Sequence, residues 1–428
     1  MSLRIFDFKR FARNGGFLNS RSKFLKMIYN KKKKAYKSIN CLGMICCLVL
    51  FSTSSSLLYA QKKPIDSLQL VDIPGYVTLK CDFHMHTVFS DGHVWPSFRV
   101  YEAQRDELDA ISMTEHIDYE GYPEEVKHDA NRSYEIGKAR AAGSTLMVIK
   151  GVEISPRVPP YHCNALFVKD ANKIPYAYMK ETHKKFIMKD SITKEELMAP
   201  FLEVQRQGAF VFYNHPGYAW WDKKDRNIFT AFHKELLEKG ILGGVEVVNS
   251  GRYNVIAHEL AMRYNLTMLG SSDEHYDIAN QYRGRRRPMT LVFAKHRDEE
   301  SIKEALIAGR TAVLMDDILI GRKALMEPFF KKAVSIHSTF KLRNGEPIVE
   351  IALQNVSDIP FCLKLASAYQ VEDFPLGRLR LAGKEQKTVV LKAVWEEVQS
   401  IDLSVNVENI ITGVNEELQF QIPVIFNR

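Results

Sequence analysis

This chain has few cysteines, and their spacing does not suit a disulfide framework or a thiolate metal site. Three of the six lie within the first sixty residues. The others, Cys81, Cys163 and Cys362, form no CxxC pair and are odd in number. Disulfide-rich domains and cysteine zinc sites show regular, paired spacings. We therefore expect Cys81 and Cys163 to be small apolar residues buried on strands.

A long hydrophobic run is also missing. The apolar stretch from Cys41 to Phe51 is shorter than the roughly twenty residues that a membrane-spanning helix needs. It follows the basic segment 31–37 and precedes small residues that end at Ala60, which is the order of a secretory signal peptide. We predict a signal peptide over residues 1–60, with Met27 as an alternative start, and a linker over residues 61–75. The protein is then periplasmic or extracellular, without a stable transmembrane span after cleavage and membrane-anchored if cleavage fails.

The folded part of the chain lacks an excess of positive charge. The formal net charge is +8, but residues 1–60 hold twelve Lys or Arg and one acid, a net of +11. The whole-chain value therefore leaves −3 for residues 61–428. This balance gives no support for a surface that binds duplex nucleic acid.

No arrangement of Ser, His and Asp suggests a protein nucleophile, whereas histidines and carboxylates occur in short clusters. The nine candidates are His84, His86, Asp91, His116, Glu153, His162, His215, Asp273 and His275. One zinc ion takes only three or four protein ligands, so nine candidates predict two or three divalent ions. Most of these residues directly follow short apolar runs that read as strands.

Residues 76–332 alternate strand-like and helix-like segments, which predicts a parallel sheet or an α/β barrel. Expected strands are 77–83, 110–114, 147–152, 164–168, 209–213, 244–248, 267–270 and 289–294; expected helices are 96–108, 124–142, 193–207, 228–239 and 255–264. Barrel active sites form at the carboxyl ends of the strands, where five candidate ligands fall. Residues 333–428 are instead short period-two segments, typical of a small all-β sandwich domain of open function.

The evidence for metal binding differs from one candidate residue to the next, and some candidates could have another role. His84 and His86 lie two residues apart on an extended chain, so their side chains share one side. Glu153 follows an apolar run, where an unpaired carboxylate would be costly unless a cation neutralised it. His215 could be only a turn residue. Two further histidines, His233 and His258, are expected to face solvent.

The series HxH…SDG, TEH, GVEIS, an isolated His, NHPG and SSDEH resembles the PHP (polymerase and histidinol phosphatase) superfamily over roughly residues 76–322. The resemblance implies a distorted seven-stranded α/β (TIM-like) barrel with a di- or trinuclear site. It implies one metal at His84, His86, Glu153 and Asp273; a second at Glu153, His162 and His215; and a third at Asp91, His116 and His275. Some members have His where this chain has Asp91.

The implied activity is hydrolysis of a small phosphorylated substrate by a metal-bridging hydroxide. Histidine-rich ligation favours zinc, with manganese or iron as alternatives. We expect Arg157, Arg252 and Arg283 to hold phosphate oxygens, because the forked guanidinium matches them. Secreted bacterial members that join this barrel to a C-terminal β-domain look like phosphodiesterases, so a diester is favoured over a monoester.

Other functions stay open at this point. A histidinol-phosphatase-like enzyme or a nucleotide phosphatase would use the same ligands, although an export signal disfavours a cytoplasmic substrate. A non-catalytic metal-containing binding protein is an alternative of another class. The sequence does not specify the substrate or the oligomeric state.

Overall fold

The computed structural model describes residues 68–182, 185–217, 228–394 and 399–426. The predicted signal peptide and residues 61–67 of the predicted linker lie outside the described residues. In the part of the chain that is described, no helix has the length and apolar character needed to cross a membrane.

The first part of the fold is built on eight short strands that correspond to the apolar runs of the sequence. They are β1 (Val77–Asp82), β2 (Ala110–Ile111), β3 (Met147–Val148), β4 (Gly151–Ile154), β5 (Cys163–Leu166), β8 (Phe210–Tyr213), β9 (Leu242–Asn249) and β11 (Thr267–Ser271). Parallel ladders join β1 to β2 and β2 to β3, and a second set joins β8 to β9 and β9 to β11. The prediction that Cys81 and Cys163 are buried on strands is confirmed.

The expectation of a parallel sheet is wrong for several pairs. β12 (Met289–Ala294) runs antiparallel to β1, and β13 (Thr311–Met315) and β14 (Ile318–Gly321) continue the sheet in antiparallel steps. β4, β5 and β8 are also antiparallel neighbours. The chain passes from β4 to β5 and from β13 to β14 without a helix. Consecutive parallel strands generally need a helical crossover between them, so these two pairs are antiparallel.

The two resulting sheets meet at the end that carries the candidate ligands. A parallel bridge pairs Met85 with Glu274, and another pairs His116 with Glu153. Through these bridges β1, β2, β3/β4, β5, β8, β9 and β11 follow one another around a distorted ring. Because each bridge is a single residue pair, few backbone hydrogen bonds join the two sheets at this end. Contacts between side chains must therefore contribute to holding the sheets together there.

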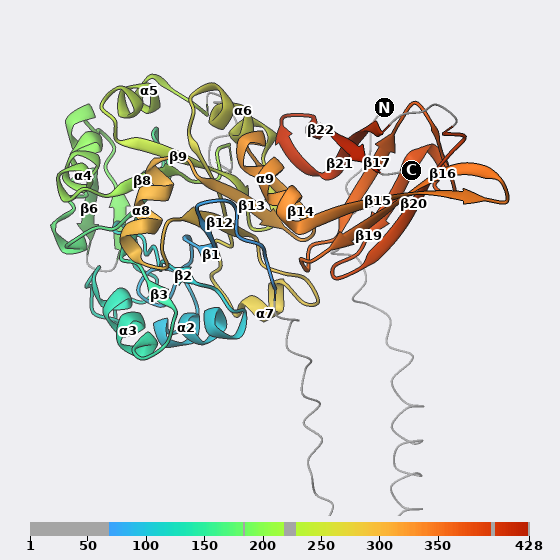
Figure 1. Ribbon diagram of the computed structural model, residues 1–428. Helices are drawn as coiled ribbons and strands as arrows, with labels where there is room; N and C mark the ends of the chain where they lie inside the picture. Colours follow the sequence, from blue (N-terminus) through green and yellow to red (C-terminus); the bar gives the residue numbers. More distant parts are fainter. Residues whose placement is uncertain (1–67, 183–184, 218–227, 395–398, 427–428) are drawn as a thin grey trace, which may run out of the picture. The chain divides into compact units, whose positions relative to one another are not determined.

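Helices cover the outside of these strands (Figure 1). They are α2 (Pro96–Arg105), α3 (Arg132–Ala141), α4 (Lys194–Gln207), α5 (Ala231–Glu238), α6 (Val255–Arg263), α7 (Ile278–Gln281) and α8 (Glu299–Ile307). α4 starts at a capping box, in which Thr193 and Glu196 satisfy each other's backbone amides. Five short strands of this part were not expected: β13 and β14, together with β6 (Met179–Thr182), β7 (Lys185–Met188) and β10 (Arg252–Tyr253).

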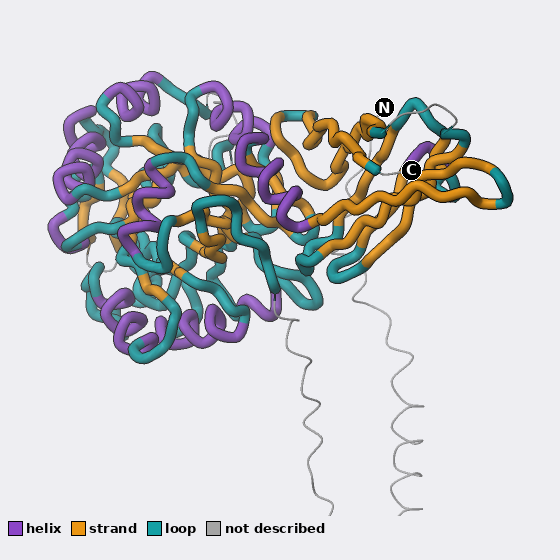
Figure 2. The backbone as a smooth tube through the Cα atoms, viewed as in Figure 1, coloured by secondary structure: helices purple, strands orange, loops and turns teal. Residues whose placement is uncertain are grey.

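Helix α9 (Lys323–Ala333) leads into a β-sandwich (Figure 2). One sheet is β15 (Val334–Arg343), β16 (Glu346–Asn355), β20 (Gln386–Lys392) and β18 (Gln370–Val371); the other is β19 (Arg378–Leu381), β17 (Phe361–Ala366), β21 (Ser400–Gly413) and β22 (Glu416–Ile425). In β17 buried and exposed residues alternate along the strand, as the period-two pattern predicts. The all-β sandwich is confirmed.

The sandwich packs directly against the α/β part. β14 pairs with β21 in parallel through Leu319 and Ile320. The ring of Phe330 on α9 packs edge-on against those of Phe361 and Phe420. One hydrophobic cluster therefore includes side chains from both parts of the chain.

Two histidines differ from the prediction that they face solvent. His233 and His258 are fully buried. Nδ1 of His233 accepts the backbone N–H of Thr230, and its Nε2 donates to the carbonyl of Pro160. His258 bonds through Nδ1 to the hydroxyl of Tyr253. Both lie on amphipathic helices whose inward faces include them, so helical position alone was a poor guide to exposure.

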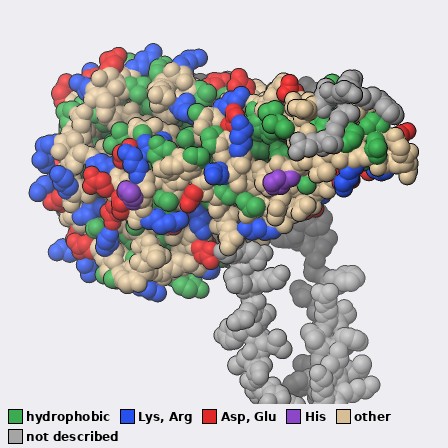
Figure 3. Space-filling model, in the orientation of Figure 1, with side chains coloured by type: hydrophobic (Ala, Val, Ile, Leu, Met, Phe, Trp, Pro, Cys, Tyr) green, Lys and Arg blue, Asp and Glu red, His purple; other side chains and the backbone are tan. Residues whose placement is uncertain are grey.

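Charged side chains of both signs are interspersed on the face drawn in Figure 3. No single sign dominates that face. This distribution accords with the small net charge of residues 61–428.

Candidate metal centre

The structure brings all nine candidate residues together at the joined ends of the two sheets. His84 and His86 follow β1, His116 follows β2, and His215 follows β8. Asp273 and His275 follow β11, Asp91 lies in the turn after β1, and His162 precedes β5. Glu153 lies within β4 rather than after it. Residues distant in the sequence therefore converge because their strands end at one place.

Glu153 is the centre of the cluster and is 1% exposed. Its Oε2 lies 3.3 Å from His84 Nε2, 3.2 Å from His86 Nε2 and 3.3 Å from His116 Nδ1. Its Oε1 lies 2.9 Å from His162 Nδ1 and 3.9 Å from His215 Nε2. One carboxylate thus faces five imidazoles, with its two oxygens directed at different sets.

Two aspartates flank this centre. Asp273 Oδ1 lies 3.2 Å from His84 Nε2 and 3.4 Å from His86 Nε2. Asp91 Oδ1 lies 3.2 Å from His275 Nε2, and its Oδ2 lies 3.5 Å from His116 Nε2. Asp273 has a φ of 51°, and His215 has a φ of 28°. Left-handed backbone at non-glycine residues costs free energy and concentrates at functional sites.

The donor atoms fit divalent ions. Four overlapping groups have atoms within 4.8 Å of one another: His86, Asp91, His116 and His275; His84, His86 and Asp273; His84, Glu153 and His215; His116, Glu153 and His162. Ligand atoms about 2.05 Å from a tetrahedral ion lie about 3.3 Å apart, and several separations here are close to that value. Glu153 belongs to two groups and can bridge two ions.

Two buried atoms give an independent test of this fit. Nε2 of His86 and Oδ1 of Asp91 make no hydrogen bond of favourable geometry with the described residues, although each lies 3.2 Å from a possible partner, Glu153 Oε2 and His275 Nε2 respectively. Buried polar atoms are nearly always satisfied by hydrogen bonds, waters or ions. Both atoms point into the cluster, where a cation would satisfy them. The carbonyl-rich or all-carboxylate shells preferred by Ca²⁺ are not what this donor set offers.

The cluster holds its charge by mutual stabilisation. Burial opposes the charged form of each group, but the carboxylates outweigh it and raise the pKa of His116 and of His275 to about 9. Conversely, although burial favours the neutral acid, the surrounding imidazoles hold the pKa of Glu153 and of Asp273 well below the usual range. The buried carboxylates therefore need positive charge beside them, which bound cations would also supply.

Behind the ligands lies a set of supporting residues that the sequence analysis missed. Glu246, fully buried on β9, accepts from His84 Nδ1 at 2.8 Å and from the His215 backbone N–H at 2.9 Å. Asn249 donates to Glu246 and to Asp273 Oδ2, at 2.9 and 3.2 Å. An outer carboxylate of this kind fixes the tautomer and orientation of a metal-binding histidine. The available signal was an isolated Glu inside the apolar run of β9.

A second support runs from His116. Its Nδ1 lies 2.7 Å from the hydroxyl of Ser155, which donates to Asp118. The hydroxyl of Tyr178 donates to the other oxygen of Asp118 at 2.7 Å. Asp118 is 2% exposed, so this chain of hydrogen bonds is shielded from water.

The three arginines expected to hold phosphate lie at the surface. Arg157 and Arg252 are exposed, and Arg283 donates to Asn280 on α7. Arg252 pairs in register with Asn249 across a turn, and this pairing brings its backbone next to a residue that contacts Asp273. Their role in phosphate binding stays a prediction.

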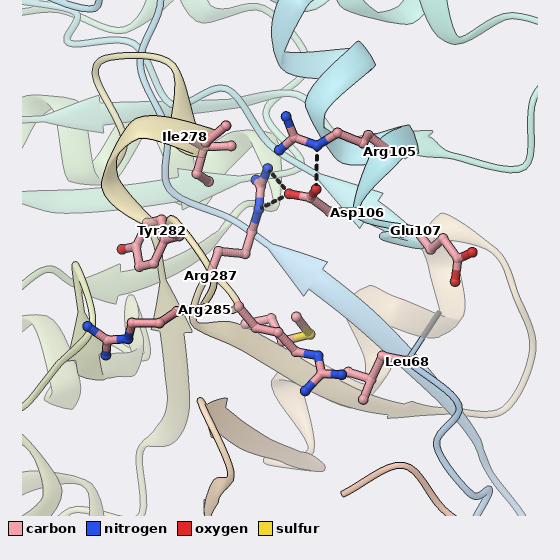
Figure 4. A pocket seen from close by; sticks show the side chains of 11 residues that line it. Leu68, Arg105, Asp106, Glu107, Ile278, Tyr282, Arg285 and Arg287 are labelled. Carbon is pink, nitrogen blue, oxygen red and sulfur yellow. Dashed lines mark hydrogen bonds and ion pairs between the residues drawn. The ribbon is translucent and has the colours of Figure 1, made fainter. Parts of the chain in front are cut away.

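Arg287, the last of three consecutive arginines, is buried although most arginines are exposed. It is 3% exposed and pairs with Asp82 at 3.2 Å and with Asp106 at 2.7 Å. Figure 4 shows the guanidinium groups of Arg287 and Arg105 turned toward the same Asp106 carboxylate, while Arg285 points away. Asp82 in turn accepts from the backbone of His84 and of Ser272. The pocket drawn in Figure 4 is lined by Asp106 and Arg287 and contains none of the nine candidate residues. Through its ion pair with Asp82, Arg287 supports the loops that carry the candidate ligands.

Comparison with known proteins matches both parts of the chain. A crystal structure from Bacteroides vulgatus, described as a two-domain protein containing a predicted PHP-like metal-dependent phosphoesterase, is 36% identical, with a TM-score of 0.71. The match covers 84% of this chain and 98% of that chain. A family model described as an Ig-like domain matches residues 334–423.

Two further similarities are more limited. An uncharacterised protein of Methanocaldococcus jannaschii is 35% identical over 82 residues, so that the match spans 19% of this chain and 36% of that relative. A Bifidobacterium adolescentis structure described as a candidate metal-dependent phosphoesterase has 17% identity and a TM-score of 0.34, covering 46% of this chain and 87% of that chain. The second likeness is too remote to carry an argument.

Proposed function

Because the chain belongs to the family of two-domain proteins with a PHP-like metal-dependent phosphoesterase domain, we propose that it hydrolyses a phosphate ester at the cluster centred on Glu153. The observation that carries the proposal is the convergence of six histidines and three carboxylates, with Glu153 shared between two groups. Two or three divalent ions fit this donor set. Zinc is favoured because imidazole dominates it, with manganese or iron as alternatives.

Divalent ions at such a site supply an activated water near neutral pH and neutralise charge on the phosphoryl oxygens. The chain's own residues do the rest. Glu153, which is buried, and Asp273, which is half-buried, hold negative charge that would attract the cations. Glu246 orients His84, and Ser155 with Asp118 orients His116. We expect Arg252, near Asn249, to bind a phosphoryl oxygen that faces solvent.

We further propose that the substrate is a small diester rather than a monoester, and that the protein works outside the cytoplasm. The supporting features are the basic-then-apolar segment before Ala60 and the pairing of the α/β part with a β-sandwich. Both resemble secreted phosphodiesterases of the superfamily. The oligomeric state plays no part in this proposal.

The test uses the chain without residues 1–60, loaded with Zn²⁺, Mn²⁺ or Fe²⁺. Release of nitrophenol from bis-p-nitrophenyl phosphate should exceed release from p-nitrophenyl phosphate, and Glu153→Gln should abolish both. Glu238→Gln, at an exposed position on α5, is the matched control and should retain full activity. Faster monoester turnover would overturn the diester preference. Tight metal binding without turnover of any ester would favour a non-catalytic binding protein.

A further inference from the structure

A buried arginine holds together the two backbone segments that carry several candidate ligands. Arg99 lies on α2 and is 1% exposed. Its Nε donates to the carbonyl of His86 at 2.9 Å. Its Nη2 donates to the carbonyl of Glu274 at 2.8 Å, and its Nη1 to that of Tyr276 at 2.7 Å. One guanidinium therefore links the segment after β1 to the segment after β11.

Glu102, one turn further along α2, fixes this guanidinium. Its Oε2 accepts from Arg99 Nη1 at 2.7 Å, and its Oε1 accepts from the backbone N–H of Ile278 at 2.7 Å. Glu102 is fully buried. Taking two charges out of water is costly unless the remaining donors and acceptors are satisfied. Here the remaining donors of Arg99 bind carbonyls of the ligand segments, which a point charge on a lysine could not match.

The linked segments serve the ligand groups unequally. His86 and His275 are two of the four members of the group that also contains Asp91 and His116, which we call the outer site. The two groups that contain Glu153 draw instead on other segments for His162 and His215. The outer site is also the more open, since the side chains of Asp91 and His275 are 32% and 29% exposed. The group of His84, His86 and Asp273 also lies on these two segments, but Glu246 and Asn249 hold His84 and Asp273 independently of Arg99. The outer site takes three of its four members from the two segments and has no contact with Glu246 or Asn249 among the described hydrogen bonds. It is therefore the group for which the link through Arg99 matters most.

We propose that Arg99, fixed by Glu102, is a positioning residue that sets metal occupancy of the outer site. Without it, the His86 and His275 backbones lose their common anchor and the four donor atoms no longer converge. The groups centred on Glu153 keep their ligands and their ions. This inference rests on the proposed metal site, but it does not depend on which ester is hydrolysed.

The experiment compares metal content and affinity in Arg99→Lys, Arg99→Ala and Glu102→Gln. The matched control is Arg132→Ala, because Arg132 pairs with Glu135 at the same spacing on α3 but at the exposed surface. Each protein is loaded with Zn²⁺, analysed for bound metal and titrated against a chelator. Disturbing residues that orient metal ligands typically costs 10–100-fold in affinity. In the Arg99 and Glu102 variants we expect one equivalent of Zn²⁺ to bind about 10–100-fold more weakly and therefore to be lost. The control should keep all of its bound Zn²⁺.

Asp91→Asn provides the reference for loss of the outer ion. Combining it with Arg99→Lys should remove no further equivalent, because both changes act on the same site. Added guanidinium should restore the lost equivalent in Arg99→Ala, which a general loss of stability would not allow. If Arg99→Ala does not fold, Arg99→Lys and Glu102→Gln carry the test.

The inference is overturned if all equivalents fall together with the melting temperature, or if none changes. The outcome for the proposed function is separate, because metal content is measured without substrate. Wild-type protein that binds its ions and hydrolyses no ester would contradict the function and leave the role of Arg99 intact.

Discussion

Replacing Glu246 with glutamine should weaken metal binding although Glu246 is too far behind His84 to be a ligand itself. The carboxylate accepts three hydrogen bonds: from His84 Nδ1, from the backbone N–H of His215 and from Asn249. When His84 binds a cation through Nε2, its Nδ1 carries the proton and donates to Glu246. Glutamine has one oxygen, so its NH₂ group must face one of these donors.

The expected magnitude follows from this mismatch. A hydrogen bond to a charged group contributes about 1.5–3 kcal/mol, and the variant loses at least one such bond. That range corresponds to about 10–100-fold in an equilibrium constant, in line with the usual effect of residues that orient metal ligands. The loss should be larger for the ion at His84, Glu153 and His215 than for the outer site, because Glu246 contacts only the former.

The assay is chelator competition with Zn²⁺, with circular dichroism to show that the fold is retained. Glu246→Asp is a second variant: it keeps the charge but shortens the reach to His84. Glu238→Gln controls for the loss of one negative charge. Zinc affinity of Glu246→Gln within twofold of wild type would refute the orienting role.

Three further outcomes are expected. Glu153→Gln should lose the ions that share this residue, with metal affinity reduced at least about 100-fold in equilibrium dialysis. A variant that binds as many ions as the wild type would contradict the assignment of Glu153 to two ions. Apparent metal affinity should rise as the pH increases toward about 9, because His116 and His275 must release protons before they bind cations. Calorimetry in buffers of different ionisation enthalpy would count the protons released. Burial lowers the pKa of His233 to about 4. The unfolded chain, with a pKa near 6.5, therefore binds the proton first, and stability present above pH 6.5 should fall by about 3 kcal/mol toward pH 4. Urea melts of His233→Gln should lack that component; an unchanged pH slope would argue against it.

Most strand positions and the convergence of the nine candidate ligands were predictable because each leaves a local mark in the sequence. An apolar run of four to eight residues marks a covered strand, and a His or carboxylate directly after it marks a strand end. The antiparallel neighbours β4, β5 and β8 were not predictable in this way, since strand direction depends on connections and pairing rather than on residue type. The burial of Arg287 was hidden for a similar reason, because Asp82 and Asp106 are about two hundred residues away in the chain.

The supporting residues show most clearly where local sequence stops being informative. Glu153 and Glu246 both occupy the third position of a Gly-Val-Glu tripeptide, and both are buried on strands. By local pattern they are equivalent. In the structure they lie on opposite sides of one imidazole: Glu153 lies 3.3 Å from His84 Nε2, and Glu246 lies 2.8 Å from His84 Nδ1. The side that faces the other histidines can bind cations, and the other side can only orient the ring. The different roles of the two glutamates are therefore decided by the placement of β4 and β9 around His84, which only the fold determines.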